Sequence, residues 1–453
     1  MARLSSSASG RRVSVDLDGR TIEAREGEPL AVSLVDAGQL LLSRSVKYHR
    51  PRGAFCMAAS CGNCLVRVNG VPNVQACRVA VHDGMRVERQ NAYPSARVDV
   101  FGFIDWFFPR GMHHNTILAG VPVAEQVMAR VARQLAGLGT LPDLPARPLA
   151  DAQSLQVPVL IIGAGPAGLA ASQVLTEAGV NHVLIERDHI AGGRLNAGPL
   201  EAGAPPLDLP PANTLWTSAQ AFGVFEDAQG RFVAVEHQSI EGDRLVRIYA
   251  QALLLAVGGH ARIIPFENNE LPGIFAGRAA TRMIRRHGVL PGRQVALVGR
   301  GEELAGVHAS LAEAGITPVV TLDLGVPDAP GPTPSVGIEL GALLAEPIRA
   351  LGRAKIRGLN YRTPDGTDRR VSCDALVLAL PPSPSYELAS QLGAQVDFDP
   401  AQETFRVRAD GSGATGVPGV WVAGELLGPC SAQEAAGSGQ RAARAILAGE
   451  AAR

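Results

Sequence analysis

Four of the six cysteines lie between positions 56 and 77, and their spacing restricts the fold more than any other feature of the sequence. They form the pattern C-x4-C-x2-C-x12-C, in which three thiols share one loop of small residues and the fourth is expected from a neighbouring strand. The C-x4-C-x2-C opening is typical of plant-type [2Fe–2S] sites, whereas structural zinc sites more often show two C-x2-C-like pairs. We therefore predict a [2Fe–2S] cluster, with structural zinc as the alternative. The predicted ligands are Cys56, Cys61, Cys64 and Cys77.

The residues around these cysteines predict a small sheet with one helix. Val13, Val15 and Leu17 alternate with polar residues, and 29–37 is a short apolar run closed by a glycine. Asn69 followed by glycine is a hairpin signal. We predict an α+β domain of β-grasp, ferredoxin-like type. The predicted segments are a flexible tail (1–10), this cluster domain (11–99), and a helical connector with a proline-rich linker (100–156).

From position 157 the sequence alternates buried strands with helices, which predicts a doubly wound α/β architecture. A strand at 159–162 runs into GAGPAG and a helix, and the next strand ends in an acidic residue. The first glycine allows the turn, the second lets the backbone approach a pyrophosphate, and the third permits close helix packing. The acid is expected on the ribose hydroxyls. The dinucleotide-contacting residues predicted here are Gly163, Gly165, Pro166, Ala167, Gly168, Glu186, Arg187, Gly193 and Arg194.

Both FAD and NAD satisfy that fingerprint, and two later stretches favour FAD. Residues 253–259 resemble the apolar strand and glycine turn that mark the crossover in two-dinucleotide flavoproteins. Residues 419–425 resemble their late strand, which ends in Gly-Asp and whose acid holds the flavin ribityl chain. Glutamate stands here in place of that aspartate, one methylene longer. The residues added to the FAD site are Ala256, Gly258, Gly424 and Glu425.

A second strand–glycine–helix unit begins at Val295. Gly299 and Gly301 are present, but Leu304 stands where the third glycine belongs. Two glutamates follow Gly301, where a pyrophosphate needs positive potential. A nucleotide-binding fold is predicted, while its occupation by NAD(P) or another nucleotide stays open. The predicted boundaries are 157–275 with 395–453 for the FAD domain and 276–394 for the inner nucleotide-binding-like domain.

Composition excludes several partners. The 42 Lys and Arg residues balance 43 Asp and Glu residues, and aromatic residues make up 4 %, so neither a nucleic-acid nor a stacking surface is indicated. The polar first residues and the lack of a long apolar run predict a cytoplasmic protein without a transmembrane segment. A basic run at 44–52 precedes the first cluster cysteine and is either a solvated loop or a surface for an acidic partner or cofactor phosphate.

With these motifs located, the chain resembles the α subunits of heteromeric amine and amino-acid dehydrogenases and oxidases. That family includes the sarcosine oxidase α chain and subunits of opine dehydrogenase, hydroxyproline dehydrogenase and hydrogen cyanide synthase. The resemblance covers almost the whole chain. The stretches that carry it are SRSVKYHRPRG (43–53), VNGVPNVQACRV with DGMRVE, DVFGFIDWFFPRGMHH, LAGLG (135–139) and LPGIFAGRAATRMI (271–284).

The resemblance implies an FAD- and [2Fe–2S]-containing electron-transfer subunit. It implies two partners: a separate catalytic flavoprotein subunit of β type, and a downstream electron acceptor. Amine oxidation in that family belongs to a different polypeptide, so we assign no catalytic residue. Sarcosine oxidase α chains usually lack the cluster cysteines and continue into a folate-binding-like half, and the other members usually carry the cluster domain as a separate polypeptide. We therefore expect a fusion of the cluster and flavoprotein subunits, without folate chemistry.

Two further functions compete with this one. A self-sufficient reductase would take electrons from NAD(P)H and pass them through FAD to the cluster, but Leu304 and the glutamates of the second glycine loop disfavour it. A scaffold that has lost its redox function is disfavoured by the intact cysteine pattern and dinucleotide fingerprint.

Overall fold

The computed structural model describes residues 3–4, 10–46, 48–102, 152–239, 242–325 and 343–451, which form two compact units. The first unit contains the cysteine domain (10–102) together with an inner domain (263–325 and 343–380). The second unit contains the remaining described residues from 152 to 262 and from 381 to 451. The predicted connector and linker lie largely outside the described residues.

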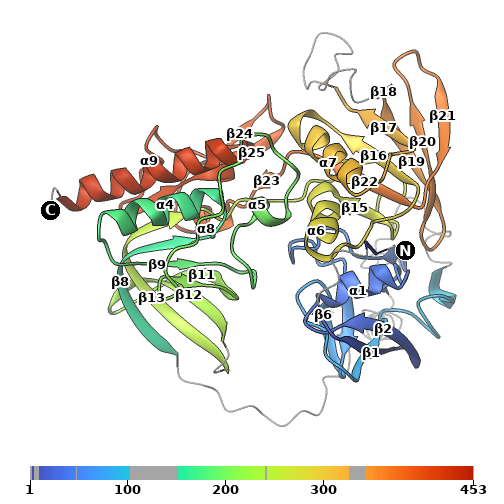
Figure 1. The fold of residues 1–453 in the computed structure, drawn as a ribbon, viewed down its shortest axis with the longest axis horizontal. Coiled ribbons are helices and arrows are strands. Elements are labelled where there is room, and N and C mark those ends of the chain that lie inside the picture. The colour runs from blue at the N-terminus through green and yellow to red at the C-terminus, as the bar shows by residue number, and fades with distance from the viewer. Residues whose placement is uncertain are drawn as a thin grey trace, which may run out of the picture. The chain divides into compact units, whose positions relative to one another are not determined.

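The cysteine domain is a five-stranded mixed sheet with one helix, as predicted. In β1, Val13, Val15 and Leu17 point into the core while the residues between them do not, which is the two-residue period of a half-buried strand. The helix α1 buries nearly its whole length against the domain. Figure 1 shows α1 beside these strands. In sheet order the strands are β2 (Arg20–Arg25), β1 (Arg12–Leu17), β7 (Met85–Glu88), β5 (Leu65–Val68) and β6 (Val71–Gln75), with α1 (Leu30–Asp36), the pair β3 (Ser43–Arg44) and β4 (Pro51–Arg52), and the short helix η2 (Val100–Gly102).

The inner domain is built on a parallel sheet whose central strands are buried on both faces. The sequences VALVG and ALVLA are entirely buried, as in sheets covered by helices on both sides. Both described helices follow directly on a strand of this sheet. In sheet order the strands are β15 (Ile274–Ala276), β22 (Ala375–Ala379), β16 (Val295–Gly299), β17 (Val320–Asp323) and β18 (Leu343–Leu344), with α6 (Gly277–His287), α7 (Gly301–Glu313) and an antiparallel sheet of β19 (Glu346–Gly352), β20 (Ile356–Arg362) and β21 (Asp368–Ser372).

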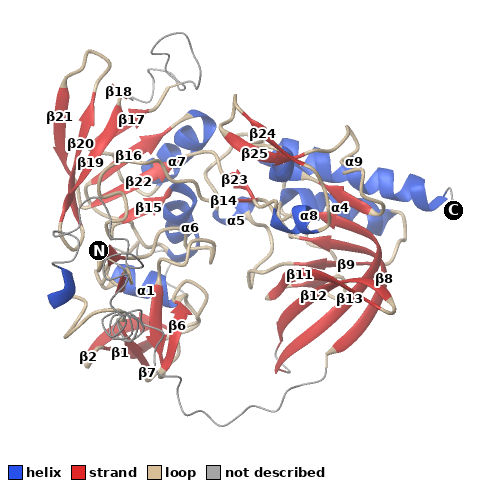
Figure 2. Ribbon diagram, turned by 180° about the vertical axis from the view of Figure 1, so that it is seen from behind, coloured by secondary structure: helices blue, strands red, loops and turns tan. Residues whose placement is uncertain are grey.

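The second unit is organised around a seven-stranded sheet in which β8 (Gln153–Ile162) runs parallel to both its neighbours. Figure 2 shows its strands fanning out below α4 and α9, which lie side by side. In sheet order the strands are β10 (Leu215–Trp216), β9 (His182–Ile185), β8, β13 (Gly242–Leu255), β12 (Gly230–Ser239) and β11 (Ala219–Asp227). The seventh strand, β26 (Val420–Val422), also pairs with β13. The remaining elements are α4 (Pro166–Glu177), α5 (Arg194–Ala197), α8 (Glu387–Gln391), α9 (Ala432–Ala451), η4 (Gly424–Leu427), and the pairs β14 (Gly259–His260) with β23 (Ser383–Pro384) and β24 (Val396–Asp399) with β25 (Thr404–Val407).

The predicted fold class is confirmed: two strand–glycine–helix domains follow a ferredoxin-like α+β domain. The compact units divide after 262 and after 380, somewhat before the predicted boundaries at 275 and 394. Residues 381–394 join the second unit because β23 pairs with β14. Residues 263–275 join the first unit through the Glu267–Arg349 bridge and the pairing of β15 with β22. No helix among the described residues is both long enough and apolar enough to span a membrane.

Gly439→Ala tests the close packing of α9 on α4. A Cβ at Gly439 would lie 2.0 Å from the carbonyl oxygen of Ala167, so alanine must push the two helices apart. We expect the free energy of unfolding to fall by about 2 kcal/mol or more, measured by urea denaturation. Gly449→Ala on the same helix is the control, because no heavy atom lies within 4 Å of its Cβ position. Equal stability of the two variants would contradict the packing described here.

Candidate cofactor sites

The four cysteines converge, although they come from two segments. Three lie on the loop between β4 and β5, and the fourth follows β6. Cys56 and Cys64 are 4 % and 3 % exposed, and the other two are half-buried. The loop turns sharply because Met57 and Ala59 adopt left-handed backbone conformations, with φ of 50° and 58°. Within it the Ala58 N–H donates a hydrogen bond of 3.4 Å to Cys56 Sγ.

The thiols are linked by hydrogen bonds in the order Cys61, Cys56, Cys77, Cys64. Bonds donated by Cys61 and Cys77 hold the pKa of Cys56 well below its ordinary value, and the bond from Cys77 lowers the pKa of Cys64. The same bonds raise the pKa of the two donors. In the described ranges, no group of three or more His, Cys, Asp or Glu side chains is arranged to hold one metal ion. Four converging thiols fit a [2Fe–2S] site, because such a cluster is held by four cysteine thiolates.

The first glycine loop forms an open cradle at the start of α4. Gly163 has a φ of +104°, and a Cβ there would lie 2.3 Å from the Ala256 carbonyl oxygen. A Cβ on Gly168 would lie 1.8 Å from the Gly163 carbonyl oxygen, so the helix can begin here only without that side chain. Around the Cβ position of Gly165, by contrast, no heavy atom lies within 4 Å. This space, beside the first-turn amides of α4, fits a pyrophosphate.

Glu186 stands at the end of β9, beside this loop. Its two carboxylate oxygens accept hydrogen bonds of 2.9 Å from the backbone N–H groups of Ala164 and Asp188. Each oxygen keeps a second lone pair, so the anchored carboxylate can still accept from ribose hydroxyls. The predicted site residue Arg187 is exposed. Gly193 lies close to the loop, since a Cβ on it would be 3.1 Å from Gly165 Cα.

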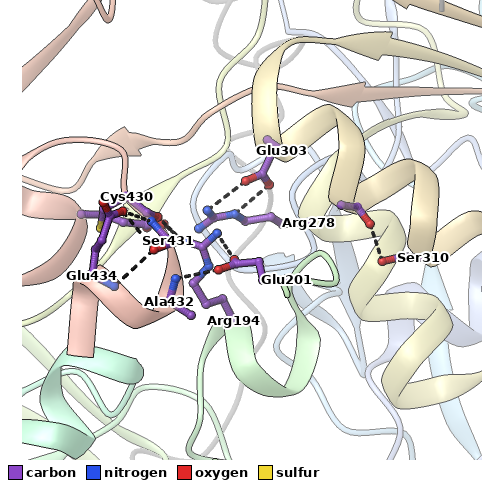
Figure 3. Close-up of polar contacts among 11 residues, drawn as sticks. Arg194, Glu201, Arg278, Glu303, Ser310, Cys430, Ser431, Ala432 and Glu434 are labelled. Atoms are coloured by element: carbon purple, nitrogen blue, oxygen red, sulfur yellow. Dashed lines mark hydrogen bonds and ion pairs between the residues drawn. The ribbon is translucent and has the colours of Figure 1, made fainter. Parts of the chain in front are cut away.

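Arg194 brings two distant carboxylates together in the second unit. Its Nη1 donates to Glu425 Oε1 at 2.9 Å and to the Cys430 carbonyl oxygen at 2.6 Å, and its Nη2 pairs with Glu201. Figure 3 shows Arg194 and Glu201 side by side. The side chains of Arg194 and Glu425 are only 11 % and 6 % exposed. Within the described residues the buried Nε–H of Arg194 has no acceptor, which fits an oxygen of a bound cofactor.

The predicted Gly-Glu pair lies next to the glycine turn at 258–259. Glu425 Oε2 is 3.2 Å from the place where a Cβ on Gly259 would stand, and a Cβ on Gly424 would lie 3.2 Å from Ala167 Cβ. The fold therefore gathers Gly258, Gly424 and Glu425 with the first glycine loop. Sequence reasoning missed Glu201, since no motif marks an acid in the loop after α5.

The second glycine loop is also open. No heavy atom lies within 4 Å of the Cβ position of Gly301, whereas a Cβ on Gly299 would meet the Ala379 carbonyl oxygen at 2.0 Å. Leu304, at the position of the third glycine, is fully buried in the core of the inner domain. Asp323 ends β17; it is buried and accepts a hydrogen bond from the Gly325 N–H.

The charge at this loop differs from the sequence prediction. Arg278, in the first turn of α6, donates two hydrogen bonds to the carboxylate of Glu303, at 2.9 and 3.1 Å. Figure 3 shows this pair. The positive charge of Arg278 offsets the negative charge of Glu303. Glu302, the other glutamate at this helix start, is not part of the pair. The start of α7 therefore repels a bound anion less strongly than the sequence alone indicates.

Two residues of the basic run at 44–52 are built into the fold, whereas the side chain of Arg50 is 42 % exposed. Arg44 donates to the carbonyl oxygens of Ala96 and His49, at 2.9 and 2.7 Å, and His49 is buried against Asp99 at 2.8 Å. These side chains are therefore structural rather than part of a solvated loop or a docking surface. Lys47 lies outside the described residues.

Comparison with known proteins identifies both halves. Residues 10–92 match the 2Fe-2S iron-sulfur cluster binding domain family, and residues 157–439 match the pyridine nucleotide-disulphide oxidoreductase family. The latter match covers more than half of the chain. The chain belongs to the pyridine nucleotide-disulphide oxidoreductase family. As a member of this family with a cluster-binding domain in the same chain, it has the predicted cofactor classes, FAD and [2Fe–2S].

Individual relatives confirm the predicted resemblance. The alpha subunit of sarcosine oxidase from Rhizobium meliloti (strain 1021) is 28 % identical over 96 % of this oxidoreductase chain and 46 % of its own length. An opine oxidase subunit from Agrobacterium tumefaciens (strain Ach5) is 26 % identical over 64 % of this chain and 65 % of its own. The chain thus spans just under half of the sarcosine oxidase relative. The crystal structure of L-proline dehydrogenase from P. horikoshii shares the fold, with a TM-score of 0.71 and 23 % identity over 98 % of this chain and 75 % of that one.

Cys61→Ser and Cys77→Ser test the cluster site. The parent protein should contain about two iron and two sulfide per chain, and each variant should lose most of both, because a cluster held by three thiolates is readily lost. Iron and sulfide analysis of anaerobically purified protein measures this. Cys430→Ser, at a half-buried thiol outside the four, should keep the full content. Zinc in the parent protein in place of iron would overturn the assignment.

Gly165→Val tests the pyrophosphate position. Gly165 has an ordinary backbone φ of −82° and an open Cβ position, so valine should leave the fold intact while filling the cradle. We expect flavin content to fall by about tenfold or more, measured after denaturation, with an unchanged circular dichroism spectrum. Gly411→Val, at another open glycine of the second unit, should retain its flavin. Full flavin occupancy in Gly165→Val would place the pyrophosphate elsewhere.

Proposed function

We propose that this chain is the FAD- and [2Fe–2S]-containing electron-transfer subunit of a heteromeric amine or amino-acid dehydrogenase or oxidase. The observation that carries the proposal is that one chain contains both four converging thiols and an open glycine loop of the kind that binds FAD in flavoproteins. Its support is the similarity to proteins named as subunits of sarcosine and opine oxidases. FAD exchanges two electrons and a [2Fe–2S] centre one, so together they can divide a two-electron oxidation into single transfers.

Each cofactor has a proposed set of holding residues. We assign the cluster to Cys56, Cys61, Cys64 and Cys77, whose side chains are largely buried and mutually bonded. We assign FAD to the first glycine loop, with Glu186 on the ribose and the Arg194–Glu425 pair toward the ribityl or pyrophosphate oxygens. The extra methylene of Glu425 is accommodated because Arg194 holds its carboxylate in place.

The partners and compartment follow from the same proposal. Substrate oxidation belongs to a separate catalytic flavoprotein subunit of β type, and a downstream acceptor takes the electrons. Six cysteines without a disulfide are consistent with a reducing compartment, so we place the protein in the cytoplasm.

The family name points to disulfide chemistry, which this chain is poorly equipped to perform. Such chemistry needs two adjacent, reactive thiols outside the cluster site. Cys373 is buried, and burial raises the pKa of its thiol to about 12, which suppresses the reactive thiolate. Cys430 belongs to the other unit.

A self-sufficient NAD(P)H-dependent reductase is the second candidate. The Arg278–Glu303 pair favours it, because it offsets one of the two acidic charges at the second loop. The open position at Gly301 and the acid that ends β17 are also compatible with a nucleotide. Leu304 and Glu302 remain the features that count against it.

Anaerobic reduction of the isolated chain separates these functions. With both cofactors bound, the flavin should not be bleached by amines, amino acids or opines, because the chain lacks its catalytic partner. Stopped-flow absorbance measures the rate, and dithionite provides the fully reduced control. Rapid bleaching by an amine would make this the catalytic subunit. Rapid bleaching by NADH or NADPH would establish the reductase instead.

A further inference from the structure

The loop that follows α5 returns to the arginine with which this helix begins. A Cβ on Gly198 would lie 2.6 Å from the carbonyl oxygen of Arg194, so the chain can turn back this tightly only without a side chain there. Farther along the loop, a Cβ on Gly203 would lie 3.5 Å from the side-chain oxygen of Gln433, in the first turn of α9. The loop therefore passes from the start of α5 to the start of α9, and Glu201 lies between these two contacts.

The carboxylate of Glu201 connects these two helix starts. Its Oε2 accepts a hydrogen bond of 2.6 Å from the backbone N–H of Ala432, the first residue of α9, and its Oε1 pairs with Nη2 of Arg194. Figure 3 shows both contacts. The side chain of Glu201 is 15 % exposed, and Ala432 is buried. Glu201 is therefore fixed to the backbone of a long helix, although it belongs to a loop.

The guanidinium of Arg194 is anchored at two of its three nitrogen atoms. Nη1 donates to Glu425 Oε1 at 2.9 Å and to the carbonyl oxygen of Cys430 at 2.6 Å, and Nη2 pairs with Glu201. A planar group that is held at one nitrogen can pivot about it, whereas a second anchor fixes its orientation. With both anchors in place, the direction of the remaining donor, the buried Nε–H, is fixed as well.

Arg194 stands beside the residues that we assign to FAD. A Cβ on Gly193, the preceding residue, would lie 3.1 Å from Gly165 Cα in the first glycine loop, and Glu425 lies beside the turn at 258–259. In the part of the chain that the structure describes, the Nε–H has no acceptor. A buried donor in this state is costly unless an oxygen of the cofactor accepts its hydrogen bond. The Nε–H contributes to FAD binding only while it points at that oxygen.

Glu201 is not needed to neutralise Arg194, because Glu425 already supplies one negative charge. Two carboxylates and one guanidinium leave one negative charge in excess beside a site for an anionic cofactor. Coulomb repulsion alone would therefore favour the loss of Glu201. The direction that Glu201 gives to Arg194, rather than its charge, is the property that would assist FAD binding.

We propose that Glu201 is a positioning residue for FAD: it fixes the guanidinium of Arg194 so that the Nε–H points at an oxygen of the bound cofactor. The proposal rests on the FAD site of the proposed function and deepens it by adding a residue that no sequence motif marks. FAD offers suitable acceptor oxygens in its ribityl chain and in its pyrophosphate.

The experiment measures how fast FAD dissociates from the full chain carrying both cofactors, by the fluorescence of released FAD after dilution. Glu201→Gln is the test variant, because glutamine has the same shape but only one acceptor oxygen for Arg194 and Ala432 together. A second readout is the nitrogen NMR resonance of the Arg194 Nε–H, which is assigned by its loss in Arg194→Lys. The control is Glu434→Gln, which removes the same charge from an exposed carboxylate in the first turn of the same helix.

In Glu201→Gln we expect FAD to dissociate about tenfold faster, the effect of one misdirected buried hydrogen bond, and the Nε–H resonance to broaden. In protein that also carries Arg194→Lys, the same substitution should change the rate by less than about twofold, because an ammonium group has no plane to orient. Arg194→Lys keeps a positive charge between the two carboxylates, so we expect it to fold. Glu434→Gln should match the parent. If Arg194→Lys loses its FAD, the Nε–H resonance in Glu201→Gln decides alone.

Equal acceleration with and without Arg194→Lys would overturn the role of Glu201 through Arg194. Unchanged or slower dissociation in Glu201→Gln would overturn the positioning role, since it would leave Glu201 only the repulsion of its charge. An unchanged Nε–H resonance in that variant would overturn it too. Failure of the proposed function is a separate result, because bleaching of the flavin by an amine or by NADH leaves FAD binding and these rates intact.

Discussion

The close approach of α4 to the strand ends is the constraint on which the second unit depends. It is possible only because Gly168, Gly163 and Gly439 have no side chains at three contacts with backbone carbonyl groups. The contacts place the first turn of α4, and its unpaired amides, directly at the ends of β8 and β9. Glu186, the turn at 258–259 and the late Gly-Glu pair then fall around one space, because their strands are parallel neighbours in a single sheet.

Three largely buried arginines each hold one or two carboxylates. Arg194 stands between Glu201 and Glu425 beside the first cradle, Arg278 offsets Glu303 at the second, and Arg3 joins two domains. Ion pairs of this kind add little net stability, because desolvation cancels most of the attraction. Their value lies in geometry: a buried carboxylate that has one arginine partner is held in one position.

The combination of parts explains how a family scaffold can serve a different chemistry. The pyridine nucleotide-disulphide oxidoreductase fold supplies two glycine loops, but outside the cluster site the remaining two cysteines lie in different units. In our proposal the second electron carrier is not a redox disulfide but the cluster held by the domain with four converging thiols. That domain contacts the inner domain at both ends of α6, and the first turn of the same helix carries Arg278, which pairs with Glu303 beside the second glycine loop.

The sequence by itself determined the local features: the glycine spacings, the strand–helix alternation and the cysteine pattern, all of which the fold reproduces. The requirement for Gly168 is short-range, since a Cβ there would meet the carbonyl oxygen of Gly163 within the same loop. The requirement for Gly163 depends on the sheet, because a Cβ there would meet Ala256 at the end of the paired strand β13. Only the tertiary structure decided which charged side chains pair. From the sequence alone Glu303 is expected to repel a bound phosphate, but the fold pairs it with Arg278, 25 residues away. Glu201 pairs with Arg194, although no sequence motif links them. Arg3 reaches a carbonyl group 284 positions along the chain. Long flexible side chains carry no spacing rule, so their partners are chosen by which surfaces the folded domains bring together.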